Sequence, residues 1–246
     1  MSKKILFVIG SGVYPHVVGG MEVFNYYLIK NLRYKAKICC LAAEKYDFNN
    51  IDFIKTFHIR PTKFTFPLQL FIRLLFHRFD KIVYSYSSAH WIIWWLFEKI
   101  AGLFRIPYVV VIHYGKQPPK DHAEAYRRFF SSAENVIAVS ADIKRNFDDK
   151  YGICCQIIPP LVPFEKSKID KILLRKTYNI PFDATAICMV GSIKGMKNPD
   201  TILEAVNMIG KEEIEKYNLH IIYAGSGEMT EMLKHKADGY GKECIF

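Results

Sequence analysis

The sequence predicts an α/β protein with two successive parallel-sheet domains. Short apolar runs such as Lys4–Ile9 and Thr185–Val190 alternate with longer segments of helical periodicity, as expected for strands buried on both faces of a parallel sheet. A segment with three prolines and a charged run, residues 159–171, divides this alternation into two parts. We therefore predict one domain at residues 1–163 and a second, partial domain at residues 164–246.

Composition narrows the class of protein. Half of the 246 residues are hydrophobic, which is enough for a sizeable core. The six cysteines show neither metal-ligand spacing nor a disulfide pattern, so buried free thiols in a reducing compartment are expected. The start of the chain has no signal-peptide pattern, and no apolar run reaches the roughly 18 residues that span a bilayer. We therefore expect a cytoplasmic location, and the inner face of the membrane is one option.

The net charge of +10 favours anionic partners. The sequence lacks zinc-finger spacing, an aromatic RNP segment and a basic heptad region, so nucleic acid is not the expected partner. Phosphorylated substrates and an anionic membrane surface are the remaining classes.

The elements of the first domain follow from periodicity. Apolar runs predict strands at residues 4–9, 36–41, 51–59, 80–86, 109–113, 135–139 and 155–158. Helical spacing predicts helices after Gly20, from Pro67 and over residues 90–103. Ser140 is the expected N-cap of a helix at residues 141–150, and Gly152 its C-cap.

The segment FTFPLQLFIRLLFHRF, residues 64–79, admits two interpretations. One helical face is expected to carry Leu68, Phe71, Leu75 and Phe79. Such a basic, aromatic-rich helix can lie on an anionic membrane, or it can pack on the sheet. We favour packing, because further apolar residues widen the face. The three tryptophans of the next helix cannot share one direction, so some should reach an acceptor groove or a membrane interface.

Two features of the first domain are candidates for ligand contact. The loop after the first strand ends in Gly19 and Gly20, where glycine permits close backbone approach to a ligand; a plain flexible turn is the alternative. Pro15 prevents a dinucleotide-binding fingerprint in this loop. His113 ends a parallel strand, at the edge where open α/β sheets bind ligands. The alternative for His113 is a side chain satisfied by a neighbouring carbonyl.

In the second domain, residues 189–208 form a candidate anion site. A strand end leads into a loop that carries Lys194 and Lys197, and Asn198 is the expected N-cap of the following helix. The amides of a helix N-terminus and an ammonium group together can hold a diphosphate. A surface loop with two solvated lysines is the alternative.

A second turn is expected beside that loop. The predicted strand Leu219–Ala224 is followed by Gly225, Gly227 and Glu228, which should turn directly into a helix with a bare N-terminus. Residues 171–178 are a predicted helix, and residues 244–246 the start of a third strand.

These segments, in this order, resemble glycosyltransferase family four. The matching residues are Val190-Gly191 with Lys197-Asn198-Pro199 and Ala205, NVIAVSADIKRNF at 135–147, and AGSGE at 224–228. The resemblance covers nearly the whole chain and implies the GT-B fold, two facing Rossmann-like domains. It also implies retaining transfer of a sugar from a nucleotide-diphospho-sugar.

The resemblance further implies roles for individual residues. His113 would contact the donor sugar as the catalytic-site residue, and the donor and its phosphates would be bound by Gly19, Gly20, Ser192, Lys194, Lys197, Gly225, Gly227 and Glu228. The lysines and helix N-termini would stabilise phosphate charge, so neither a metal nor another cofactor is expected. Ser192 stands where the family commonly has Arg, which makes Lys197 more important.

The implied partners are a nucleotide-sugar donor and a glycan or lipid-linked acceptor in cell-surface polysaccharide synthesis, with peripheral membrane contact. The family's pair of glutamates lies further along than this sequence extends, and Glu204 and Glu212 share its spacing without its context. A complementing C-terminal fragment or self-association is therefore an expectation. The alternative function is a non-catalytic remnant, or one half of a split enzyme that acts as a binding module.

Overall fold

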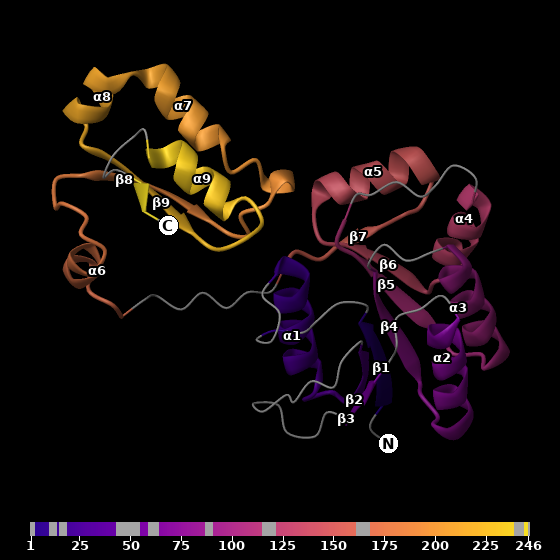
Figure 1. Cartoon of the computed structure of the whole chain (residues 1–246). Helices are drawn as coiled ribbons and strands as arrows, with labels where there is room; N and C mark the ends of the chain where they lie inside the picture. Colours follow the sequence, from indigo (N-terminus) through magenta and orange to yellow (C-terminus); the bar gives the residue numbers. More distant parts are fainter. Residues whose placement is uncertain are drawn as a thin grey trace. The chain divides into compact units, whose positions relative to one another are not determined.

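A computed structural model of the chain describes residues 3–9, 14, 19–42, 55–58, 64–86, 91–114, 122–160, 168–238 and 244–245. The chain divides into two compact units, Met1–Phe164 and Glu165–Phe246, which are described separately (Figure 1). The predicted boundary after residue 163 falls outside the described residues. Each unit contains a parallel sheet with helices, so the predicted α/β class is confirmed.

Unit 1 is built on a seven-stranded sheet in the order β3-β2-β1-β4-β5-β6-β7, and every pair is parallel. Its strands are β1 (Lys3–Ile9), β2 (Ala36–Ala42), β3 (Lys55–His58), β4 (Lys81–Tyr86), β5 (Tyr108–Ile112), β6 (Asn135–Ala138) and β7 (Gln156–Ile157). The chain adds β2 and β3 on one side of β1 and then continues with β4 on the other side. In open α/β sheets, ligands bind at the carboxyl ends of the strands where the order reverses, which here are the ends of β1 and β4.

Helices cover both faces of this sheet (Figure 1). They are α1 (Gly20–Leu32), α2 (Thr65–Phe76), α3 (Trp91–Leu103), α4 (Ala123–Ser131) and α5 (Ala141–Tyr151). Along β1, Leu6 and Val8 join the core under α2 to α5, whereas Phe7 and Ile9 join the core under α1. The two cores thus follow from the alternation of side chains along buried strands. Helix α4 was not expected from the sequence.

The helix α2 packs on the sheet as expected, but the predicted face is wrong. Phe66, Leu70 and Leu74 are buried, whereas Leu68 and Leu75 are 59% and 57% exposed. Because α2 carries large apolar residues on opposite faces, spacing alone did not identify the face that packs.

Both caps predicted for α5 are confirmed. Ser140 accepts a hydrogen bond from the backbone N–H of Ile143 at 3.3 Å and caps α5. Gly152 ends α5 with φ of 62°, a left-handed conformation that glycine adopts without steric cost.

The cysteines whose side chains the structure describes are free thiols, but Cys154 and Cys188 are exposed rather than buried. Among the described residues, none of the helices is long and apolar enough to cross a membrane.

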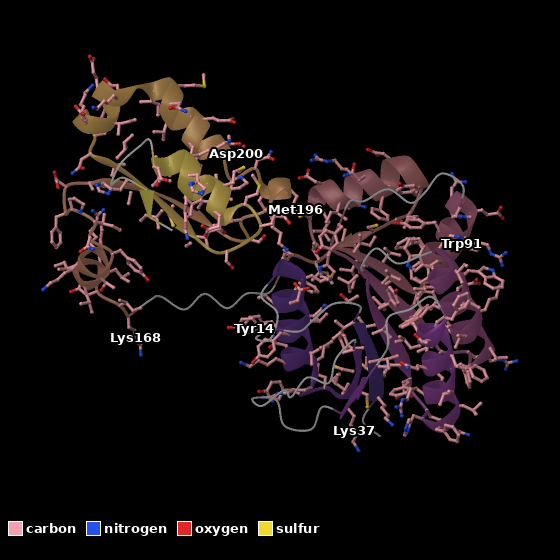
Figure 2. The ribbon with its side chains drawn as sticks, viewed as in Figure 1. Tyr14, Lys37, Trp91, Lys168, Met196 and Asp200 are labelled. Atoms are coloured by element: carbon pink, nitrogen blue, oxygen red, sulfur yellow. The ribbon has the colours of Figure 1, made fainter. Side chains whose placement is uncertain are left out.

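Unit 2 contains a three-stranded parallel sheet in the order β10-β9-β8. Its elements are α6 (Lys171–Thr177), β8 (Thr185–Val190), the 3-10 helix η2 (Gly195–Lys197), α7 (Thr201–Ile209), α8 (Lys211–Lys216), β9 (Leu219–Ala224), α9 (Thr230–Ala237) and β10 (Cys244–Ile245). Leu203 and Val206 of α7 and Leu233 of α9 pack on β9 to form its core. Asp200, labelled in Figure 2, lies just before α7. Its carboxylate forms an ion pair with Lys236 of α9 at 3.6 Å, which links the start of α7 to α9.

The predicted start of α7 is wrong. The helix begins at Thr201, and Asn198 adopts a left-handed conformation with φ of 45° after η2 instead of capping the helix. Leu203 and Val206 face the core, whereas Ala205 is exposed. The prediction that Lys197 directly precedes a helix N-terminus is therefore corrected: the turn Asn198–Asp200 separates them.

Candidate functional site

In unit 1, the alternation of strand side chains brings Ser85 and His113 together. Val83 of β4 and Val111 of β5 both join the core under α1. Side chains two residues apart on a strand point to the same face. Ser85 and His113, which follow Val83 and Val111 by two residues, therefore also face α1, at the carboxyl edge of the sheet. Ser85 lies opposite Ile9 of β1, next to the reversal of strand order. His113 thus lies at the edge where the sequence placed it.

A hydrogen-bonded chain connects His113 to α1. The side-chain amide Nδ2 of Asn25 donates to Ser85 Oγ at 2.9 Å, and Ser85 Oγ lies 3.1 Å from His113 Nε2. The Phe24 ring meets the imidazole edge-to-face, with centroids 5.1 Å apart. Because Asn25 already donates to it, the Ser85 hydroxyl can donate its own proton to Nε2. When the hydroxyl donates in this way, the proton of the neutral ring lies on Nδ1.

Burial determines the charge of this cluster. It lowers the pKa of His113 to about 4, so the imidazole is neutral at pH 7. Asn25 is fully buried, and its Oδ1 has no hydrogen-bond partner in the described structure. A neutral imidazole has one donor and one acceptor nitrogen, so it can hydrogen-bond to a hydroxyl group without carrying charge.

Gly19 and Gly20 lie at the start of α1, and the space around each of them differs. A Cβ on Gly19 would lie 2.2 Å from Oε2 of Glu22, which is buried against the helix N-terminus, whereas a Cβ on Gly20 would meet no atom within 4 Å. A side chain at position 19 would therefore require the Glu22 carboxylate to move, whereas one at position 20 would have open space. The predicted contact of both glycines with a donor stays a prediction.

In unit 2, backbone hydrogen bonds join the loop after β8 to the turn after β9. The N–H of Gly191 donates to Ala224 O at 3.0 Å, and the N–H of Ile193 donates to Ser226 O at 3.0 Å. The N–H of Met229 returns to Ile193 O at 3.2 Å. The two predicted phosphate-binding segments, residues 191–197 and 225–228, therefore lie side by side.

The glycines of the second turn make this approach possible. A Cβ on Gly225 would lie 1.8 Å from Gly191 O, and one on Gly227 would lie 2.1 Å from Ile193 O. The structure thus gives both glycines a packing role that needs no ligand.

The expectation of a bare helix N-terminus at this turn is wrong for two amides. Helix α9 begins at Thr230 rather than directly after Gly227. The N–H of Gly227 donates to Thr230 Oγ1 at 3.0 Å, and the N–H of Met229 is used by the neighbouring loop. Side chains must therefore supply much of any anion binding here.

Two lysines offer that charge. Lys194 and Lys197 are exposed, and in the described part of unit 2 neither ammonium has a hydrogen-bond or ion-pair partner. Ser192 is partly buried, and Glu228 is exposed at the neighbouring turn. Two exposed cations thus belong to the loop that pairs with the turn at residues 225–228, which suits a diphosphate.

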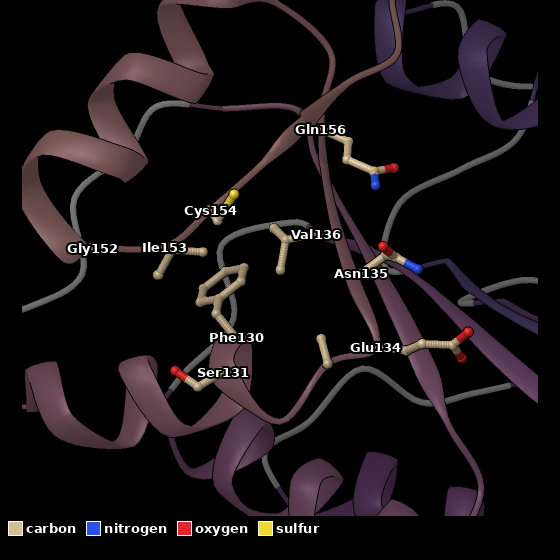
Figure 3. A pocket seen from close by; sticks show the side chains of 10 residues that line it. Phe130, Ser131, Glu134, Asn135, Val136, Gly152, Ile153, Cys154 and Gln156 are labelled. Carbon is tan, nitrogen blue, oxygen red and sulfur yellow. The ribbon is translucent and has the colours of Figure 1, made fainter.

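A pocket elsewhere in unit 1 does not involve these residues. It opens at the amino-terminal edge of the sheet, among residues that precede β6 and β7 such as Phe130, Glu134 and Cys154 (Figure 3). Ligands of open α/β sheets bind at the opposite, carboxyl edge. Among the described residues, no three or more His, Cys, Asp or Glu side chains gather as a metal site would need.

Comparison with known families decides the assignment. Residues 18–166, more than half of the chain, match the sequence model of Glycosyltransferase Family 4. The chain belongs to glycosyltransferase family 4. The resemblance proposed from the sequence is therefore confirmed.

Two curated relatives are glycosyltransferases. An uncharacterized glycosyltransferase of Methanocaldococcus jannaschii is 22% identical over 248 residues, which cover 89% of this chain. A D-inositol 3-phosphate glycosyltransferase of Geodermatophilus obscurus is 27% identical over 138 residues, which cover 52% of this chain and 31% of that protein. The chain spans 62% of the length of the first relative.

Solved structures confirm the GT-B fold. The Anabaena protein HepE, in complex with UDP and glucose, aligns with a TM-score of 0.71 at 16% identity, over 99% of this chain and 68% of HepE. A glycosyltransferase from Rickettsia africae aligns with a TM-score of 0.75 at 15% identity, over 100% of this chain and 68% of its own. At this identity, the likeness establishes the fold alone.

Proposed function

We propose that this family 4 member transfers a sugar, with retention of anomeric configuration, from a nucleotide-diphospho-sugar to a glycan or lipid-linked acceptor. Cell-surface polysaccharide synthesis at the inner face of the membrane is the proposed setting. Family membership supports the class of reaction, and the UDP and glucose in the HepE complex support the class of donor.

One observation carries the proposal for the donor. The loop of residues 191–197 and the turn of residues 225–228 are held together by backbone hydrogen bonds, and Lys194 and Lys197 of that loop are exposed. As the sugar departs, negative charge develops on the nucleoside diphosphate, and fixed cations stabilise it. We propose that these lysines supply that charge in place of a metal ion.

His113 has a different task in this proposal. Its pKa of about 4 keeps it neutral at pH 7, so it serves as a hydrogen-bonding group for a sugar hydroxyl rather than as a proton donor to the leaving group. Ser85 and Asn25 position the ring through the contacts described above.

Lys197→Ala is expected to weaken binding of nucleoside diphosphates by about tenfold, on the order of one charged hydrogen bond in an exposed setting. Titration calorimetry with uridine, guanosine and adenosine diphosphates measures the change for the nucleotide that binds best. Lys176→Ala, which removes an exposed lysine of α6, is the matched control and should leave affinity unchanged.

Equal affinity of Lys197→Ala and the unsubstituted chain would contradict the donor site. A separate assay measures sugar transfer from the nucleotide sugar whose nucleotide binds best. We expect turnover that persists in EDTA. Donor binding without turnover in the presence of any acceptor would instead favour the alternative function, a binding module.

A further inference from the structure

Two polar side chains are buried where α1 packs on the sheet of unit 1. Asn25 and Ser85 are 0% and 1% exposed, in a region that contributes Phe24, Val83 and Val111 to the apolar core. An amide and a hydroxyl in such surroundings cost stability unless hydrogen bonds compensate them, and Asn25 Oδ1 has no such bond. Apolar side chains of similar size would avoid this cost. The pair therefore points to a role other than packing.

The donors and acceptors of this pair fix the direction of its hydrogen bonds. Asn25 Nδ2 can only donate, so Ser85 Oγ accepts from it at 2.9 Å. Among the described residues, the acceptor within reach of the hydroxyl proton is His113 Nε2, at 3.1 Å. If Nε2 carried a proton, two N–H groups would point at Ser85 Oγ, and the buried hydroxyl would have no acceptor, which is costly. Nε2 therefore accepts, and the neutral ring carries its proton on Nδ1.

The other ring nitrogen is available to a ligand. Nδ1 of His113 makes no hydrogen bond within the described part of unit 1, and it is not sealed from solvent as Asn25 Oδ1 is. His113 follows the carboxyl end of β5, at the edge where open α/β sheets bind ligands. An N–H group at this position donates a hydrogen bond to a ligand oxygen.

We propose that Ser85 is a positioning residue for His113: its hydroxyl, held by Asn25, confines the ring proton to Nδ1, so that the imidazole presents a donor and not an acceptor to a ligand oxygen. Burial keeps the ring neutral at pH 7, and only a neutral ring has two tautomers to choose between. The tautomer follows from contacts within unit 1 and holds whether or not the chain transfers sugar. Only the identity of the ligand oxygen, a sugar hydroxyl, rests on the proposed function.

Nuclear magnetic resonance of the full chain, labelled with nitrogen-15 in its histidines, tests the tautomer. The shifts of the ring nitrogens and their couplings to the ring C–H protons distinguish a protonated nitrogen from a bare one. The chain has eight histidines, and the signals that disappear in His113→Gln identify those of His113. At pH 7.5 we expect a single tautomer of His113, with its proton on Nδ1.

Ser85→Ala removes the hydroxyl, whereas Ser85→Thr keeps it. In Ser85→Ala, Nε2 no longer faces a donor, so signals of a ring protonated at Nε2 should appear. Ser85→Thr should retain the tautomer of the unsubstituted chain, although its extra methyl group disturbs the packing of a buried site. A role in packing alone predicts the opposite order of the two variants. Ser131→Ala, at an exposed serine that ends α4, is the control and should leave the His113 signals unchanged.

A ring protonated at Nε2 in the unsubstituted chain would overturn the proposal, and this measurement needs no variant to fold. An unchanged tautomer in Ser85→Ala would also overturn it, because the hydroxyl would then not determine where the ring proton lies.

Titration calorimetry extends the test to the ligand. Ser85→Ala should bind the nucleotide sugar that binds best about two- to tenfold more weakly, as expected for one neutral hydrogen bond, and Ser85→Thr should bind it normally. Affinity for the free nucleoside diphosphate should stay the same, since its proposed contacts lie in unit 2. A chain that binds no nucleotide sugar would contradict the proposed function, while the tautomer, measured without ligand, still decides the role of Ser85. Unchanged nucleotide-sugar affinity in a Ser85→Ala chain with an altered tautomer would overturn the assignment of Nδ1 as the donor to the ligand.

Discussion

Gly225→Ala is expected to destabilise unit 2 by about 3 kcal/mol or more. The new Cβ would lie 1.8 Å from Gly191 O and 2.9 Å from Gly191 C. Both are backbone atoms, so no side-chain rotation relieves the clash. Separating the loops would lengthen or break the hydrogen bond between Gly191 N–H and Ala224 O, and overpacking of this kind is costly.

Two spectroscopic signals assign the effect to one unit. All three tryptophans of the chain, Trp91, Trp94 and Trp95, lie in α3 of unit 1. In urea unfolding, far-ultraviolet circular dichroism reports both units, whereas tryptophan fluorescence reports unit 1. We expect Gly225→Ala to lower the midpoint of the unit 2 transition in circular dichroism and to leave the fluorescence midpoint in place.

Gly195→Ala is the matched control within the same loop. Its Cβ would lie 3.7 Å from Met229 Sδ, an ordinary contact distance, so stability should change by less than about 1 kcal/mol. Identical transitions for Gly225→Ala and Gly195→Ala would show that the two loops are not packed as the structure has them.

The strands were predictable because their signal is local. Strands β8 and β9 have the predicted bounds, and a buried strand in a parallel sheet needs only a short apolar run. The start of α7 was not predictable in the same way. Asn198 suits an N-cap, but asparagine also tolerates the left-handed conformation that it adopts here, and only the preceding 3-10 helix selects between them.

The candidate site shows the same division between local and distant information. The position of His113 followed from its strand, whereas its partners Ser85 and Asn25 were missed. A signal existed for each: Ser85 is a polar residue in an apolar strand, and Asn25 lies four residues from both Met21 and Ile29, which are buried. Their meeting depends on the order of the strands, which the sequence alone does not give.

The glycines of unit 2 show why resemblance and structure give different reasons for one residue. The family motif associates Gly225 and Gly227 with the nucleotide, but the distances show that each also faces a backbone carbonyl of the neighbouring loop. Such a contact joins residues more than thirty positions apart, so no local pattern reveals it. Loss of donor binding in a Gly225 variant must therefore be separated from loss of folding.

Unit 1 is expected to lose about 2 kcal/mol of stability between pH 7.5 and pH 5 through His113 alone. Burial lowers its pKa from 6.5 to about 4 in the folded chain. Between these two values the unfolded chain binds more protons, so lowering the pH favours unfolding. The contribution is intact above pH 6.5, falls as the pH drops below it, and levels off near pH 4.

His113→Gln removes this titration while keeping a side chain that can hydrogen-bond to Ser85. We expect the fluorescence-detected stability of the variant to fall less between pH 7.5 and pH 5, by about 2 kcal/mol, whatever its stability at pH 7.5. His235→Gln is the control, since His235 is exposed in unit 2 and should leave the fluorescence transition unchanged at both pH values. Equal pH dependence with and without His113 would mean that its ring is hydrated and titrates normally. The imidazole could then carry a proton near neutral pH, and its proposed role as a neutral hydrogen-bonding group would be wrong.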